Sequence, residues 1–88
     1  MRAIKIRTNP PNSRNLLSIT HVYLMGERNG WFSRDAVYIM VSENPGCVQV
    51  GLYPFSNVVP EHTERGVPYI RSSPLGSFSD SLLSLPRG

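Results

Sequence analysis

Two segments near the start of the chain alternate in the way that is typical of β-strands, with successive side chains on opposite faces. Residues 3–7 (AIKIR) alternate apolar and basic side chains, and the proline pair at 10–11 ends this segment because proline has no N–H to give to a sheet. Residues 17–25 (LSITHVYLM) place odd-numbered residues on one face and even-numbered residues on the other, and neither face is wholly polar. The second strand is therefore predicted to be central, with His21 among apolar neighbours.

A helix is predicted over residues 34–43. Ser33 is a suitable N-cap because its hydroxyl can accept a bond from a free backbone N–H, and Asp35 follows in the first turn, where the helix dipole favours a negative charge. The predicted sheet-facing residues are Ala36, Ile39 and Met40. Alternation across residues 37–41 would equally suit a strand, and the capping residues favour the helix.

The second half of the chain contains two further predicted strands, residues 47–53 (CVQVGLY) and 67–72 (VPYIRS), the latter starting at a sheet edge because of its proline. Residues 54–66 between them are predicted to form a long loop. Chain ends are usually polar and frayed, yet three leucines follow within four positions near the end of this sequence. The tail, residues 73–88, is therefore predicted to dock on the domain.

These elements predict a single α+β domain over residues 1–88. It would have two layers, with one helix on an antiparallel or mixed sheet of about four strands, in the order β-β-α-β-β plus the docked tail. The composition agrees with a folded chain, since 40% of the 88 residues are hydrophobic and 17% are charged.

The cysteine content and the basic residues indicate which compartment and which kind of ligand suit the protein. The single Cys47 excludes an intramolecular disulfide and a multi-cysteine metal site, and it suits the reducing cytoplasm. No export signal and no apolar run of about 20 residues occurs, so we expect a soluble protein without a membrane partner. Eight of the nine basic residues are arginine. The planar guanidinium group of arginine can donate two parallel hydrogen bonds to a phosphate or a carboxylate. A GC-rich genome would also explain the preference for arginine over lysine.

The sequence contains no motif that is typical of a catalytic or metal-binding site. His21 and His62 are 41 positions apart and form no paired spacing with a cysteine or another histidine. Cys47 has no flanking motif, and the serines lie at predicted caps and turns and in the tail. The carboxylates of Glu61 and Glu64 fall in the predicted loop, and no glycine-rich phosphate loop is present. We expect no enzymatic activity, no cofactor and no metal.

Four motifs follow one another along the chain: ITHVY at 19–23, SRDAV at 33–37, YIR at 69–71 and DSLLSLP at 80–86. In this order they resemble domain-of-unknown-function family 3892, a family of small bacterial and phage proteins. The resemblance covers roughly residues 3–86. It implies a fold with a helix that starts near Ser33, and it gives no expectation about activity.

The resemblance places His21, Arg34, Tyr69, Arg71 and Asp80 at motif positions. Arg34 would lie in the first turn of the helix, where free N–H groups and the dipole favour an anion. If Arg71 and His21 lie on neighbouring strands beneath it, the group forms a pocket for phosphate or carboxylate. The alternative is a structural pin, in which Asp80 pairs with Arg71 or Arg34 and His21 is a core histidine. An inward-facing arginine needs such a partner because an unpaired buried charge costs several kcal/mol.

Nucleic acid is a further candidate partner. Arg2, Lys5 and Arg7 lie on one face of the first predicted strand, and Arg14 follows in the loop. The aromatic residues that could stack on bases are Tyr23, Trp31, Phe32 and Tyr53. A solvated strand face would explain the same basic residues.

The sequence therefore favours a non-enzymatic binding module for a protein partner or an anionic small molecule. Because the similar family includes phage members, the resemblance implies an inhibitor that blocks a host protein or sequesters an anionic nucleotide. Weak nucleic-acid binding is the alternative.

Overall fold

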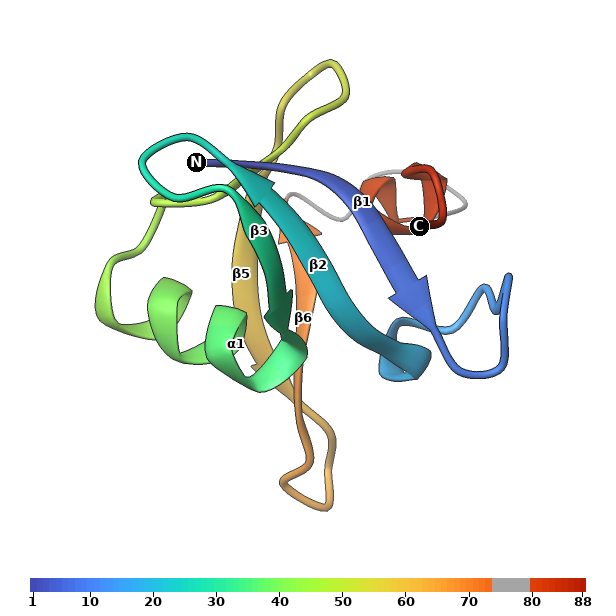
Figure 1. Ribbon diagram of the computed structural model, residues 1–88. Helices are drawn as coiled ribbons and strands as arrows, with labels where there is room; N and C mark the ends of the chain where they lie inside the picture. Colours follow the sequence, from blue (N-terminus) through green and yellow to red (C-terminus); the bar gives the residue numbers. More distant parts are fainter. Residues whose placement is uncertain (74–79) are drawn as a thin grey trace.

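Six strands and one α-helix are formed by residues 1–73 and 80–88, the part of the chain that the computed structural model describes (Figure 1). The strands are β1 (Arg2–Thr8), β2 (Ile19–Met25), β3 (Gly30–Ser33), β4 (Gln49–Val50), β5 (Asn57–His62) and β6 (Pro68–Ser73). The helix α1 spans Arg34–Glu43, and two short 3-10 helices are η1 (Leu16–Ser18) and η2 (Ser81–Ser84). The α+β class with the helix packed on a mixed sheet agrees with the prediction.

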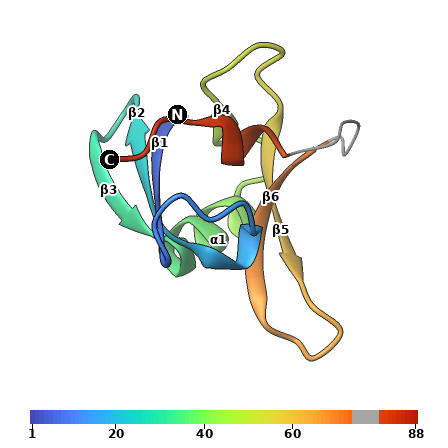
Figure 2. The same ribbon diagram turned by 90° about the vertical axis from the view of Figure 1, so that its right-hand side faces the viewer.

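The sheet has the order β3-β2-β1-β4-β5-β6, and its neighbours are antiparallel except for β1 and β4, which are parallel. Figure 2 shows that the sheet bends into two limbs, β1–β2–β3 and β5–β6, joined through the short β4. The helix α1 contacts both limbs, through β2 and β3 on one side and β5 and β6 on the other. The core therefore lies between the limbs and the helix. Within the described residues no helix is long and apolar enough to cross a membrane.

The prediction of about four strands was wrong, because β3 and β5 were not recognised and the chain order is β-β-β-α-β-β-β. β5 lies inside the predicted long loop and contains Pro60. The predicted strand 47–53 shrinks to two residues, so β4 ends early, and most of one edge of β5 has no partner strand among the described residues. Proline is tolerated at such an edge because no N–H is needed there.

Strand β2 is central, as predicted, but an irregularity at Thr20 changes which of its side chains face the core. Thr8 pairs with Ile19 and Arg7 pairs with His21, so Thr20 has no partner across the ladder. An extra residue of this kind shifts the side chains that follow it to the opposite face. The buried residues of β2 are Ile19, Val22 and Leu24. His21 is half-buried on the outer face, so the prediction that it lies on the same face as Ile19 was wrong.

The predicted helix is confirmed, with the same bounds. The Ser33 hydroxyl accepts a hydrogen bond from the N–H of Ala36 at 3.1 Å, as expected of the N-cap. The predicted buried face was right in part, because Met40 packs against the core. Ile39, however, is 56% exposed, and the fully buried side chains of the helix are those of Val37 and Val41. These two are one turn apart and their branched side chains fill the space between the limbs.

The part of the tail that the structure describes, residues 80–88, docks as predicted; residues 74–79 of the predicted tail lie outside the described residues. Leu82, Leu83 and Leu85 are 0%, 7% and 3% exposed and belong to the core. After η2 the chain runs beside β1, where Ile6 donates its N–H to the Pro86 carbonyl at 3.0 Å. The tail thus continues along the edge of β1 that the two-residue β4 leaves open.

Candidate anion-binding cleft

The five residues highlighted by the sequence fall into two groups. His21 on β2 and Arg34 at the start of α1 lie at one end of the β2–β3 pair, since His21 is opposite Ser33 in the ladder. Tyr69 and Arg71 lie on β6, and Asp80 precedes η2. No hydrogen bond or ion pair joins any two of these five residues, all of which the structure describes. His21 and Arg34 line two different cavities, and Tyr69, Arg71 and Asp80 line neither of them.

Arg71 is neutralised by Glu61 on the neighbouring strand. Its Nε donates to Glu61 Oε2 at 3.2 Å, and its Nη1 donates to the Ser72 carbonyl at 3.2 Å. The Glu61 carboxylate also accepts from the backbone N–H of His62 at 3.1 Å. This backbone bond, followed by the bond from Arg71, holds the pKa of Glu61 below its ordinary value. Tyr69 stands opposite Glu61 in the ladder.

Asp80 does pin the tail, although not through an arginine. Its Oδ2 accepts from the Ser72 N–H and its Oδ1 accepts from the Leu82 N–H, both at 2.9 Å. The expected ion pair with Arg71 or Arg34 was therefore wrong. The physical reason is that the edge of β6 and the first turn of η2 both present free N–H groups, and one carboxylate can satisfy both.

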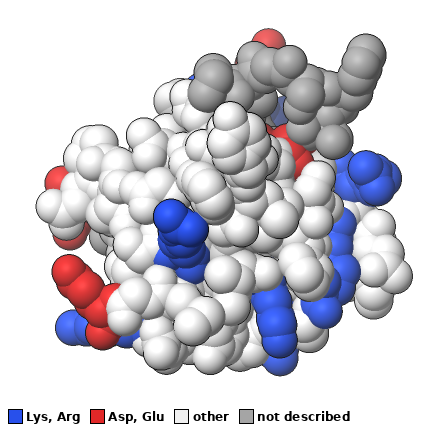
Figure 3. Space-filling model, turned by 90° about the horizontal axis from the view of Figure 1, so that it is seen from above, with Lys and Arg blue, Asp and Glu red and all other residues white. Residues whose placement is uncertain are grey.

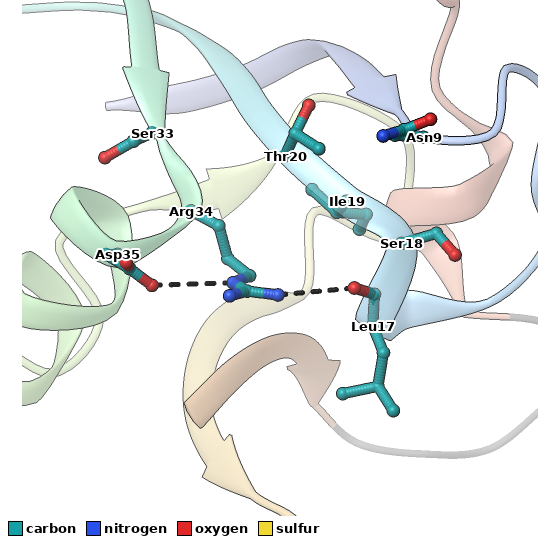
Figure 4. A pocket seen from close by; sticks show the side chains of 8 residues that line it. All are labelled: Asn9, Leu17, Ser18, Ile19, Thr20, Ser33, Arg34 and Asp35. Atoms are coloured by element: carbon teal, nitrogen blue, oxygen red, sulfur yellow. Dashed lines mark hydrogen bonds and ion pairs between the residues drawn. The ribbon is translucent and has the colours of Figure 1, made fainter. Parts of the chain in front are cut away.

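Arg34 lines a cavity of about 270 Å³ at the N-terminal end of α1 (Figure 4). The close-up shows its side chain reaching from α1 toward η1, where Nη1 donates to the Leu17 carbonyl at 3.2 Å. Its Nε is buried, has no hydrogen-bond partner within residues 1–73 and 80–88, and lies 3.5 Å from Asp35 Oδ1. Asp35 also lines the cavity. Its negative charge makes this cavity a poor place for an anion.

A second cavity, of about 450 Å³, has no acidic residue in its lining. It lies between the end of β1, the loop after it, β2 and the last two residues of the described chain. Its lining residues are Arg7, Thr8, Asn9, Pro11, Asn12, Thr20, His21, Arg87 and Gly88. Three of these side chains are basic, so this cleft, which we call the cationic cleft, is the strongest candidate for an anion site.

The basic side chains of the cationic cleft are held by their neighbours. Arg7 donates from Nε to the Gly88 carbonyl at 3.1 Å, and Arg87 donates from Nη2 to the Leu83 carbonyl at 2.9 Å. The Nη1 of Arg87 is buried and has no hydrogen-bond partner within the described residues. An unpaired buried donor costs free energy, about 1–3 kcal/mol.

His21 is oriented through Thr20. The Thr20 hydroxyl donates to the Arg7 carbonyl at 3.3 Å and lies 3.1 Å from His21 Nδ1. Nδ1 donates to the hydroxyl oxygen in one ring tautomer and accepts the hydroxyl proton in the other. The other ring nitrogen, Nε2, has no partner in the part of the chain that the structure describes.

The sequence patterns did not bring these three basic residues together. Arg7 and His21 face each other because β1 and β2 pair antiparallel. Arg87 reaches them because it forms a parallel bridge with Ile6. The only local signal for this is the alternation of Leu85, Pro86 and Arg87, which indicates an extended segment after η2.

Comparison of the chain with models of known families, with curated proteins and with solved structures finds no match. Within the described residues, no group of three or more His, Cys, Asp and Glu side chains could hold a metal ion. The case for a site therefore rests on the side chains of the cationic cleft.

Proposed function

We propose that the protein is a non-enzymatic binding module for a small phosphate-bearing molecule, with a nucleotide as the ligand class. The observation that carries this proposal is the convergence of Arg7, His21 and Arg87 on a cleft that has no Asp or Glu side chain in its lining. Guanidinium groups suit phosphate oxygens because their planar forks donate two parallel hydrogen bonds. The volume of about 450 Å³ is within the usual range for small-molecule sites, roughly 300–1,000 Å³.

The polar contacts in the cleft favour binding over catalysis. Within the described residues, the Thr20 hydroxyl is the one side-chain group in hydrogen-bond contact with His21, and it also contacts the Arg7 carbonyl. The cleft lining has no Asp or Glu side chain that would orient the ring as a general base. These groups can hold an anion without transforming it.

Sequestering a nucleotide is the mode of action that fits such a module. The resemblance to a family with phage members suggests an inhibitor, and a cleft with three basic groups favours capture of a nucleotide over obstruction of a host protein. A protein partner remains the second proposal, with the exposed Tyr53 and Phe55 as its anchor residues.

Thermal unfolding in the presence of inorganic phosphate and of mono-, cyclic and dinucleotides tests the proposal. Native protein should be stabilised by mass action, by about 2.7 kcal/mol at a concentration one hundred times the Kd. Arg87→Gln and His21→Asn should each lose most of that gain. The matched control Arg28→Gln, which removes an exposed arginine from the turn between β2 and β3, should keep it. No stabilisation of native protein by any of these compounds would contradict the proposal.

A further inference from the structure

A row of basic side chains leads away from the cationic cleft along the outer face of β1. Arg2, Lys5 and Arg7 are all exposed. They share one face because the register shifts between Ala3 and Lys5, so that Ala3 and Ile6 both point into the core. Figure 3 shows that several Lys and Arg side chains gather on the right-hand side of one face of the molecule.

Each basic residue of this row has an aromatic neighbour. The pairs are Arg2 with Phe55, Lys5 with Tyr23, and Arg7 with Trp31. The guanidinium carbons of the two arginines lie 4.2 Å and 4.1 Å from the centres of their rings, and Lys5 is directly opposite its tyrosine in the ladder. We call these six residues the β1 stripe. Because Arg7 also lines the cationic cleft, the stripe and the cleft form one continuous surface.

The aromatic part of the stripe is fixed in place. The Tyr23 and Trp31 rings meet edge to face, with their centres 5.3 Å apart. Gly88 lies against Trp31 so closely that an added Cβ would overlap the indole ring. At the other end of the stripe Tyr53 is 87% exposed and its ring centre is 6.1 Å from that of Phe55. The stripe is thus a preformed surface in which guanidinium groups cover one face of the Phe55 and Trp31 rings and present their own planes to solvent.

From this surface we infer that the protein binds single-stranded nucleic acid, with one phosphate in the cationic cleft and the following nucleotides along the β1 stripe. The inference rests on the proposed function, because it uses the same cleft. At a rise of about 3.3 Å per residue, Arg2 and Arg7 are roughly 17 Å apart, so the stripe holds several phosphates of one strand. Unstacked bases stack on aromatic rings and on arginine planes, which a paired duplex cannot do.

Two residues considered from the sequence do not belong to this surface. Phe32 is partly buried and packs against the core. Arg14 is exposed in the loop before η1 and is not part of the stripe or of the cleft lining. An Arg14→Gln variant is therefore a second charge-matched control, nearer to the cleft than Arg28→Gln.

The test titrates native protein with a dT 12-mer and a U 12-mer, with a 12-base-pair duplex and with dTMP. Trp31 is the only tryptophan, so its fluorescence reports directly on the stripe. We expect a 12-mer to bind at least tenfold tighter than dTMP and the duplex, and to quench Trp31. With three phosphate contacts at about −0.7 each, the slope of log affinity against log salt should be near −2, which is roughly a twentyfold loss between 50 and 200 mM salt.

Variants separate the stripe from the cleft. Arg2→Gln and Lys5→Gln replace exposed side chains, and each should weaken binding of the 12-mers fivefold or more without changing the affinity for dTMP. Arg87→Gln should weaken both, and Arg14→Gln and Arg28→Gln should weaken neither by more than twofold. Equal 12-mer affinity in the native, Arg2→Gln and Lys5→Gln proteins would overturn the inference.

The outcomes also separate this inference from the proposed function. Binding of dTMP and of the 12-mers with equal affinity would leave the cleft in place and overturn the stripe. Tight 12-mer binding without measurable dTMP or phosphate binding would uphold the stripe and overturn the small-molecule proposal. Equal affinity for duplex and single strand would overturn the single-stranded specificity, and binding of none of these probes would overturn both proposals.

Discussion

The Asp80 carboxylate accepts a hydrogen bond from the Ser72 backbone N–H at 2.9 Å, and this bond ties the tail to the edge of β6. The other oxygen of the same carboxylate caps η2 through the Leu82 N–H. One buried side chain therefore satisfies two backbone donors that the fold would otherwise leave unpaired. It also determines where η2 begins, and η2 carries the leucines that complete the core.

Replacing Asp80 should cost much of the stability of this small domain. Asp80→Ala leaves two buried N–H groups without acceptors, and we expect a loss of about 2–4 kcal/mol in urea unfolding. Asp80→Asn keeps one acceptor and should lose less. The matched control Asp35→Ala removes a carboxylate that is 72% exposed and should cost under about 1 kcal/mol. An Asp80→Ala protein as stable as the native one would show that the cap is not needed.

The leucines of η2 should behave as core residues. Leu82 is fully buried, so Leu82→Ala should lower the free energy of unfolding by about 3 kcal/mol through lost burial and the cavity left behind. Leu17→Ala makes the same chemical change at a side chain that is 41% exposed, and its cost should stay below about 1 kcal/mol. Similar losses in both variants would mean that residues 80–88 are not packed as described.

Acidic pH should remove the contribution of Glu61 to the stability of the fold. Hydrogen bonds from the His62 N–H and then from Arg71 lower the pKa of Glu61 in the folded protein. A lowered folded pKa stabilises the fold above the unfolded pKa, and the contribution disappears as the pH falls through the folded pKa. Glu61→Gln should therefore have a slightly lower Tm than native protein near neutral pH, and the difference should vanish on acidification.

Thermal unfolding at a series of pH values checks this. Glu64→Gln is the matched control, since Glu64 forms no hydrogen bond within the described residues. A Glu61→Gln difference that stays constant or grows as the pH falls would contradict the role given to this carboxylate.

Features set by neighbouring residues could be predicted from the sequence. The helix follows from Ser33 as N-cap and Asp35 in its first turn, and both of its ends agree with the prediction. The docking of the leucines follows from their density in the tail. Features set by distant partners could not be predicted. Pro60 argues against a strand until it is known that β4 is only two residues long.

The candidate site also depends on contacts between residues that are distant in the sequence. The pairing of Arg7 with His21 depends on a register that one irregularity at Thr20 displaces. The bond from Arg7 to the Gly88 carbonyl joins residues 81 positions apart, so no local pattern reveals that Arg87 lies beside them. Five candidate residues came from motif positions, and only His21 lines the cationic cleft.

The central claim is that the cationic cleft holds a phosphate group, and two-dimensional ¹H–¹⁵N NMR of the labelled protein titrated with adenosine 5′-monophosphate tests it most directly. The largest shifts should occur at the amides of Thr8, Asn9, Thr20, His21 and Gly88. Amides of the turn between β2 and β3 should not move, and Arg87→Gln should abolish the shifts. Shifts concentrated at Ser33, Arg34 and Asp35, or no shifts at millimolar nucleotide, would contradict the claim.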